Sequence, residues 1–197
     1  MFKLGITGGI GAGKSTACKF FKNKGATIFN ADEESKKYLI SNPFLQKKIM
    51  HSYEHNIFKD NQFNLNNLAE IAFSSPENQK KLNKIMWPEV FKLIKIASTK
   101  ANKKKCDLFI VDAALLFEAG YLDFFDSILL ISASKEIRIK RIIERKGLTT
   151  HQINKRMELQ MDEKEKKKRA DMNIENNEDL YTFHDNLDFY YRNLQIH

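Results

Sequence analysis

Short apolar runs, separated by longer polar stretches, predict a buried parallel sheet. Most of these runs lack polar alternation, which is typical of parallel strands covered on both faces. A turn residue or a glycine-rich loop borders several of them. The strands that we expect are residues 2–7, 27–30, 108–112, 127–132 and 172–176. The chain is therefore expected to be an α/β protein with a five-stranded sheet.

The N-terminal part of the chain predicts a β-α-β unit. Residues 14–24 place Ala17, Phe20 and Phe21 at helical spacing between the first two strands. Such a unit implies parallel strands with a right-handed crossover, and ligands bind such sheets at the carboxyl ends of the strands. We therefore look for a site where the first two strands end.

The next segment, residues 31–103, is polar with a helical repeat of apolar positions. Asn42-Pro43 and Ser75-Pro76 each resemble an N-cap followed by proline at the first helical position. This pattern predicts a helical subdomain inserted between the second and third strands.

A glycine-rich segment after the first strand predicts a phosphate-binding loop. From Gly8 to Ser15 the chain reads Gly-Gly-Ile-Gly-Ala-Gly-Lys-Ser, which fits Gly, any four residues, Gly-Lys and Ser or Thr. The glycines allow backbone N–H groups to surround a polyphosphate, and Lys14, expected to face solvent, adds a positive charge. The Ser15 hydroxyl is a candidate ligand of Mg²⁺.

Two carboxylates leave the predicted strands at the same edge. Asp112 ends the buried strand 108–112, where it is placed to hold Mg²⁺ or its waters, although capping of the next turn is a structural alternative. Asn30 and Asp32 leave the second strand and are expected to face the phosphates. Asp32 is the candidate base for an acceptor hydroxyl.

The most basic part of the chain predicts a lid. Arg138, Arg141 and Arg145 share one face of a helix. After a turn at Gly147, a second helix opens with a capping box of Thr149 and Gln152. We expect this second helix to carry Arg156 and Gln160 one turn apart. Arginines on such a lid would stabilise a transferring phosphoryl group, while closure excludes water.

Length and composition limit the function classes. The chain has 197 residues, a formal charge of +8 and no apolar stretch near the roughly 18 residues of a membrane span. We expect one folding unit in the cytoplasm, with no membrane and no nucleic-acid partner. The cysteines Cys18 and Cys106 are interpreted as core residues without chemistry.

These features together favour a small-molecule kinase that transfers a phosphoryl group from ATP. A GTPase would need guanine-reading and switch motifs, and a motor ATPase is usually much longer. A nucleoside monophosphate kinase remains open as an alternative. So does a basic binding module that uses ATP as a switch, although aromatic residues interleaved with basic ones, typical of nucleic-acid binders, are missing.

Four segments resemble the dephospho-coenzyme A kinases, a family of P-loop kinases, over almost the whole chain. They are Gly5 to Thr16, Asn30-Ala31-Asp32, Val111-Asp-Ala-Ala-Leu-Leu-Phe-Glu118, and Arg141 to Arg145 with Arg156, Gln160 and Ala170 through Asn176. The resemblance implies transfer of the γ-phosphate of ATP to the 3′-hydroxyl of the ribose of dephospho-coenzyme A. This is the final step of coenzyme A synthesis.

The resemblance also implies roles for residues and segments. Asp32 would be the base, Lys14 and Arg141 would assist catalysis, Ser15 and Asp112 would support Mg²⁺, and adenine would rest near Arg141 and Asn176. The nucleotide-binding residues would be Gly8, Gly9, Gly11, Ala12, Gly13, Lys14, Ser15, Thr16, Arg141 and Asn176. The core would comprise residues 1–34, 104–137 and 168–197, the substrate-binding insertion 35–103 and the lid 138–167. The protein would be a monomer or weak homo-oligomer.

Several residues depart from the pattern of the resembling family. Asn30 stands where the family usually has an aspartate, and Trp87 where it has a histidine before Pro88. Ala114 replaces a proline, and Leu65 and Ala69 replace two arginines. These departures concentrate on the side of the acceptor substrate.

Overall fold

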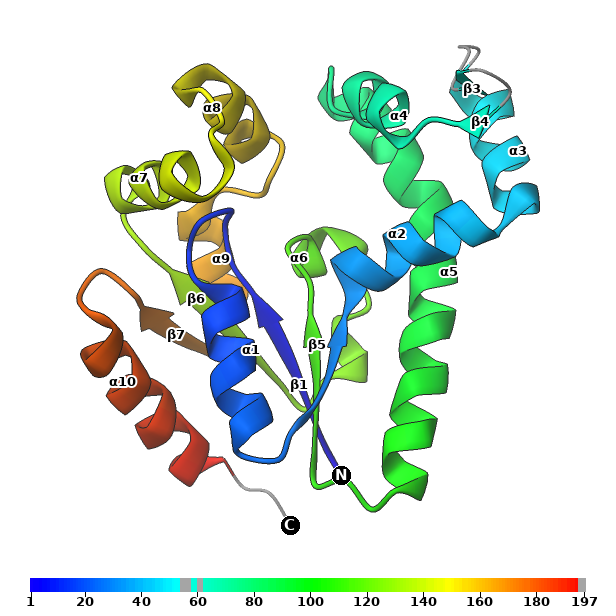
Figure 1. Ribbon diagram of the computed structural model, residues 1–197. Coiled ribbons are helices and arrows are strands. Elements are labelled where there is room, and N and C mark those ends of the chain that lie inside the picture. The colour runs from blue at the N-terminus through cyan, green and yellow to red at the C-terminus, as the bar shows by residue number, and fades with distance from the viewer. Residues whose placement is uncertain (54–57, 60–61, 195–197) are drawn as a thin grey trace.

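A parallel sheet organises the protein, whose computed structural model describes residues 1–53, 58–59 and 62–194 (Figure 1). Its five strands lie in the order β2-β5-β1-β6-β7, and each adjacent pair is parallel. The strands are β1 (Phe2–Thr7), β2 (Thr27–Asn30), β5 (Leu108–Asp112), β6 (Ser127–Ser132) and β7 (Met172–Glu175). The predicted five-stranded α/β fold is confirmed.

The register of the strands aligns the ends that carry the candidate residues. Ile6 of β1 lies beside Asp112 of β5, and Asn30 of β2 lies on the other side of Asp112. Strand β1 is central, and the chain leaves it towards β2 on one side before it returns to β6 on the other. The loop after β1 therefore lies where the order of the strands reverses, the usual ligand position in such sheets.

Two hydrophobic cores cover the two faces of the sheet. Helices α1 (Lys14–Asn23) and α10 (Leu180–Asn193) cover one face, where Ile110 packs with Phe21 and Leu187. Helix α5 (Pro76–Lys103) covers the other face, where Phe109 and Val111 pack. Because apolar side chains point to both faces, the β5 sequence shows no polar alternation.

The segment between β2 and β5 is mainly helical. It contains α2 (Ala31–Ser41), α3 (Pro43–Tyr53), the two-stranded hairpin β3 (Phe58–Lys59) and β4 (Gln62–Phe63), α4 (Leu65–Ala72) and α5. As predicted, the side chains of Asn42 and Ser75 accept bonds from the first turns of α3 and α5. Leu39, Ile49 and Leu68 belong to a third apolar cluster that joins these helices. The hairpin was not expected from the sequence.

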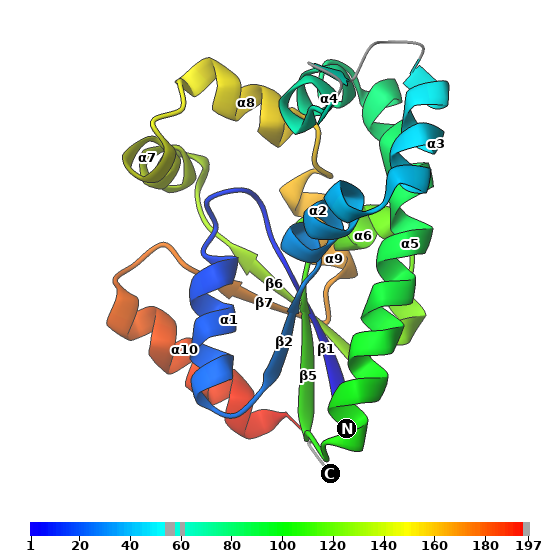
Figure 2. The same cartoon turned by 45° about the vertical axis from the view of Figure 1, so that its right-hand side comes forward.

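The chain between β6 and β7 forms three short helices, and this segment is the predicted lid region. They are α7 (Lys135–Lys146), α8 (Thr150–Glu158) and α9 (Glu163–Arg169). The capping box of Thr149 and Gln152 is present. In both views α7 and α8 stand beyond the carboxyl ends of β6 and β7, and α2 to α4 stand beyond β2 (Figures 1 and 2). The short helix α6 (Leu116–Ala119) and the 3₁₀ turn η1 (Leu122–Phe124) follow β5.

The sequence located most elements within one or two residues. Strand β7 ends at Glu175 rather than at Asn176, and α1 ends at Asn23 rather than at Lys24. Helix α8 ends at Glu158, so Gln160 lies beyond it and not one turn from Arg156 on the helix, as the spacing predicted. In the described part of the chain no helix is both long and apolar enough to cross a membrane. The division into core, insertion and lid stays a prediction.

Candidate active site

The glycine-rich loop turns sharply from β1 into α1, and its close packing explains the glycines. Gly13, the N-cap of α1, has a φ of 107°, a left-handed conformation that side chains disfavour. A Cβ atom at Gly13 would lie 2.2 Å from Nδ2 of Asn176. The Gly13 carbonyl accepts from the Thr16 and Ala17 N–H groups, so α1 starts directly at the loop, and a helix N-terminus in this position favours an anion.

Two residues of the lid region bind the loop at Ile10. The Ile10 N–H donates to Oε1 of Gln160 at 3.1 Å, and the Ile10 carbonyl accepts from Nε of Arg138 at 3.1 Å. Arg138 is buried and also pairs with Glu163. The lid region is therefore attached to the phosphate-binding loop through both backbone polar groups of one residue.

Asn176 and Arg141 lie together beside Ala12 of the loop. Nδ2 of Asn176 donates to the Ala12 carbonyl at 2.8 Å. Arg141 donates from Nη1 to the Asn176 carbonyl at 3.0 Å and from Nη2 to its Oδ1 at 3.3 Å. These two residues, expected near adenine, are thus brought together beside the loop. Arg145 of the same helix is exposed.

The lysine of the loop faces the two candidate carboxylates. Nζ of Lys14 is 3.9 Å from Oδ1 of Asp112. Asp32 follows β2, and its Oδ2 accepts from the Ala114 N–H at 3.3 Å. The Lys14 side chain is only 14% exposed, so the expectation that it faces solvent was wrong. Its stem packs in the interior while its charge faces the carboxylates.

The pKa values of both carboxyl groups are raised, chiefly because desolvation disfavours their charged forms. Desolvation raises the pKa of Asp112, Lys14 opposes this effect, and the charge of Asp32 adds to it. The pKa of Asp32 is raised by desolvation and lowered by Lys14 and by the Ala114 N–H. Asp32 is nevertheless exposed to solvent. Neighbouring protein atoms partly desolvate its carboxylate, but water still reaches it.

The chemistry of Asp112 and Ser15 fits a magnesium ion. Oδ1 of Asp112 is buried and has no hydrogen-bond partner among the described residues, and Ser15 is exposed. Mg²⁺ prefers oxygen ligands and is usually held by one or two carboxylates together with substrate phosphates. The described residues include no group of three or more His, Cys, Asp or Glu that could hold a metal.

The Asn30 side chain has a local structural role. Its Oδ1 accepts from the Glu33 N–H at 2.9 Å and caps α2, and a contact of Asn30 with the phosphates stays a prediction. Asn is a strong N-cap residue, and this local bond takes its amide oxygen. The Cys18 thiol is buried as predicted, and burial raises its pKa.

The structure adds contacts that the sequence analysis missed. Glu118 Oε1 accepts from the Met161 N–H at 2.8 Å and lies 3.8 Å from Nζ of Lys166. Glu118 ends the Leu-Leu-Phe-Glu segment, which was the available signal. Lys166 is within a run of lysines that predicts a solvated surface, yet it is 1% exposed.

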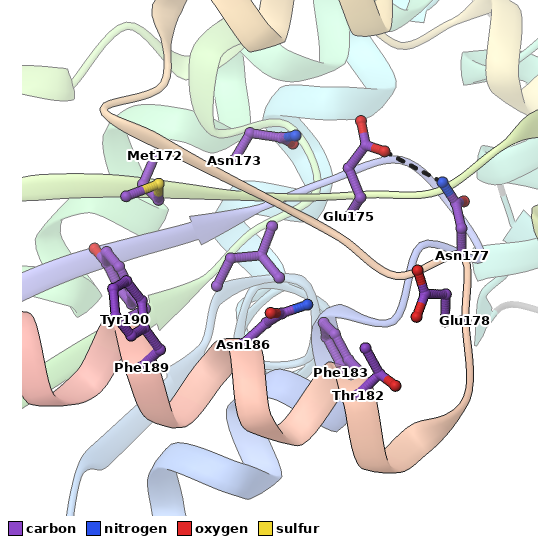
Figure 3. Close-up of a pocket in the computed structure, with 11 residues that line it drawn as sticks. Met172, Asn173, Glu175, Asn177, Glu178, Thr182, Phe183, Asn186, Phe189 and Tyr190 are labelled. Carbon is purple, nitrogen blue, oxygen red and sulfur yellow. Dashed lines mark hydrogen bonds between the residues drawn. The ribbon is translucent and has the colours of Figure 1, made fainter.

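A separate pocket of about 340 Å³, called here the β7–α10 hollow, lies between β7 and α10 (Figure 3). Asn173, Asn177 and Asn186 line it with apolar residues such as Phe183. Asn177 donates from Nδ2 to Oε2 of Glu175 at 3.3 Å across its rim. Neither Lys14 nor either candidate carboxylate lines this hollow, so we distinguish it from the candidate active site.

Comparison with known proteins gives a consistent result. A family model described as dephospho-CoA kinase matches residues 2–182. A dephospho-CoA kinase of Salinibacter ruber is 34% identical, over 89% of this chain and 89% of its own length. One from Fusobacterium nucleatum is 35% identical, over 90% of each chain.

Solved structures are similar over nearly the full length. A Thermus thermophilus protein has 27% identity and a TM-score of 0.81, with 98% of both chains covered. The dephospho-CoA kinase from Campylobacter jejuni has 26% identity and a TM-score of 0.68, covering 96% of this chain and 95% of its own. A shikimate kinase from Acinetobacter baumannii is 13% identical with a TM-score of 0.55, a similarity of fold alone.

We predict that Gly13→Ala abolishes tight nucleotide binding. The new Cβ would displace Asn176, which also holds Ala12 and Arg141. Gly25→Ala is the matched control, because Gly25 has a φ of 95° but open space around a Cβ. Both variants carry a left-handed strain of about 1–2 kcal/mol, but only Gly13→Ala should weaken ADP binding in calorimetry. Equal affinities would contradict the packing argument.

We also predict that Asp112→Asn stabilises the fold while it removes activity. Because the pKa of Asp112 is raised in the folded protein, the charged form costs stability as pH rises through that pKa. The variant should gain about 1 kcal/mol of unfolding free energy at pH 7, and the gain should vanish below the ordinary Asp range. Thermal unfolding between pH 3 and pH 8, with exposed Asp185→Asn as control, measures this. A loss of stability at pH 7 would overturn the charge argument.

Proposed function

Because the chain belongs to the dephospho-CoA kinase family, we propose that it transfers the γ-phosphate of ATP to the ribose 3′-hydroxyl of dephospho-coenzyme A. The products are ADP and coenzyme A, so the reaction is the final step of coenzyme A synthesis. The observation that carries this proposal is the convergence of Lys14, Asp112 and Asp32 beside the glycine-rich loop, in a chain matched over residues 2–182.

The nucleotide would bind along the loop. The backbone of the segment from Gly8 to Thr16 surrounds the phosphates, with the Lys14 ammonium at the terminal ones. Arg141 and Asn176, which are bonded to each other, support the adenine end. Ser15 and Asp112 would hold Mg²⁺, which when bound neutralises charge on the β- and γ-phosphates.

Asp32 would accept the proton of the acceptor hydroxyl. One of its oxygens is oriented by the Ala114 N–H, which leaves the other to receive the proton. The deprotonating 3′-oxygen forms a bond to the γ-phosphorus as the bond from that phosphorus to the β–γ bridging oxygen breaks. ADP leaves with that electron pair, and Lys14 stabilises the negative charge on the phosphate oxygens.

The acceptor would lie between the insertion, residues 35–103, and the lid, residues 138–167. Helices α2 to α4 of the insertion and α7 and α8 of the lid stand beyond the carboxyl ends of the strands (Figure 2), where closure excludes water. A cytoplasmic location and a monomeric or weakly associated state complete the proposal.

An ADP-release assay with Mg·ATP tests the acceptor directly. Dephospho-coenzyme A is compared with adenosine, AMP, CMP and UMP, and the product is identified by mass. Selective formation of coenzyme A is expected. Turnover of a monophosphate alone would indicate a nucleoside monophosphate kinase, and ATP binding without any transfer would favour an ATP-switched binding module.

Asp32→Asn should lower kcat about 10²- to 10⁴-fold, the usual contribution of a general base, while ADP affinity changes little. Asn preserves the acceptor for the Ala114 N–H, so the local structure is kept. Exposed Asp185→Asn serves as the control. Parallel losses of kcat and ADP affinity would contradict the role as base.

Ala114→Pro should move the acidic limb of the pH profile of kcat/KM to higher pH. The variant removes the N–H that lowers the pKa of Asp32, so the base becomes protonated at a higher pH and activity is lost earlier on acidification. Ala114→Gly retains the N–H and should leave the limb in place. Identical limbs in the two variants would show that this bond does not tune Asp32.

A further inference from the structure

One lysine of α9, Lys166, is buried with N–H donors that no described residue accepts. Lys166 is 1% exposed, and its Nζ has no hydrogen-bond partner among the described residues. Its neighbours in the sequence, Lys164, Lys167 and Lys168, are exposed. An ammonium group has three N–H donors, and burying it without hydrogen bonds is strongly unfavourable. Such a cost calls for a compensating function.

The ion pair with Glu118 does not supply this compensation. Oε1 of Glu118 is 3.8 Å from Nζ, beyond hydrogen-bond distance, and already accepts from the Met161 N–H at 2.8 Å. The other oxygen of Glu118 is buried and also lacks a hydrogen-bond partner in the described structure. The Lys166 ammonium and the second Glu118 oxygen therefore both lack hydrogen bonds in the described structure. The charged groups of a stable buried salt bridge are normally hydrogen-bonded.

The charges around Lys166 favour an anion. Lys14 and Arg138 are close enough to lower the pKa of Lys166 further, in addition to desolvation, whereas Glu118 and Glu163 oppose this. Glu163 is already paired with Arg138, and Lys14 belongs to the phosphate-binding loop. Three cations thus gather next to the loop, and their mutual repulsion is relieved when a polyanion binds.

The neighbours of Lys166 also indicate which end of the nucleotide it faces. Arg141 and Asn176, which are expected near adenine, are bonded to each other, and Asn176 also binds the Ala12 carbonyl of the loop. Glu118, by contrast, belongs to the segment after β5 in which the Ala114 N–H binds Asp32. Through Glu118, Lys166 is therefore linked to the segment that binds Asp32, the candidate base that also faces Lys14. This is where the terminal phosphate would meet the acceptor.

We propose that Lys166 is a further catalytic residue whose ammonium donates hydrogen bonds to the oxygens of the transferring phosphoryl group. The inference rests on the proposed function for the identity of the acceptor. Glu118 holds the lysine near its position, and the nucleotide supplies the acceptors that Glu118 does not. Lys166 stabilises charge while the phosphorus moves from the ADP oxygen to the acceptor oxygen, and its own bonds to hydrogen do not break.

Lys166→Met tests the proposal, because methionine replaces the stem with an apolar side chain and removes the charge. We expect kcat to fall on the order of 10²-fold, as when one charge-stabilising donor is removed. ADP affinity should stay within about twofold, whereas affinity for ADP with aluminium fluoride, which mimics the transferring group, should fall at least about tenfold. Lys168→Met, which removes an exposed charge from the same helix, should match the wild type in all three measurements.

Equal losses of affinity for ADP and for ADP with aluminium fluoride would overturn the proposal, and so would unchanged kcat. Glu118→Gln is the second variant, in case Lys166→Met does not fold. It keeps the oxygen that binds Met161, and it should retain most of the affinity for the fluoride complex. A collapse of thermal stability and affinity together would instead assign Lys166 to a structural ion pair.

The readouts separate this inference from the proposed function. If the wild type binds ADP with aluminium fluoride but does not convert dephospho-coenzyme A, the proposed acceptor is wrong. The role of Lys166 is then judged by the affinity ratio alone. If the wild type forms coenzyme A and Lys166→Met does so equally well, only the inference about Lys166 fails.

Discussion

The charge of Lys14, held against two carboxylates at the edge of the sheet, is the interaction on which the site depends. Asp112 is buried, and burial favours its neutral form. Lys14 opposes this by lowering the pKa values of Asp112 and Asp32. The fold therefore keeps an acidic pair next to a phosphate-binding loop, an arrangement that costs stability and whose benefit is chemical.

This arrangement follows from the register of a parallel sheet. Strand β5 lies between β1 and β2, so the residues that leave these strands emerge side by side. The loop lysine comes from β1, Asp112 from β5 and Asp32 from the residues after β2. Apolar cores on both faces fix the strands, and segments distant in sequence are thereby held in one small volume.

The sequence predicted the parts of the protein that depend on local pattern. Apolar runs and the turn residues that border them located β1, β2, β5 and β6 to the residue, and the caps at Asn42 and Ser75 were visible as Asn-Pro and Ser-Pro pairs. The loop motif likewise drew attention to Lys14, whose ammonium faces Asp112 in the structure. In each case the neighbours that decide the structure lie within a few positions along the chain.

Two features that the sequence analysis did not predict have different causes. Asn30 caps α2 through a local bond from the Glu33 N–H, which its position at the end of a strand did not indicate. Lys166 is buried although its neighbours form a charged, exposed run. Nothing in a lysine run distinguishes the member that the helix turns inward, because that choice depends on how α9 packs against β6 and Glu118.

The contacts at Ile10 couple the lid region to the loop and give the buried cations a common role. Arg138 and Gln160 occupy the carbonyl and N–H of Ile10, so movement of the lid away from the sheet must break these bonds or carry the loop with it. Arg138 lies close enough to Lys166 to lower its pKa, so the same movement changes the charge around that lysine. If α7 to α9 move as a lid, loop geometry, lid position and the positive potential at the loop would therefore change together, and a polyanion bound to the loop would stabilise all three.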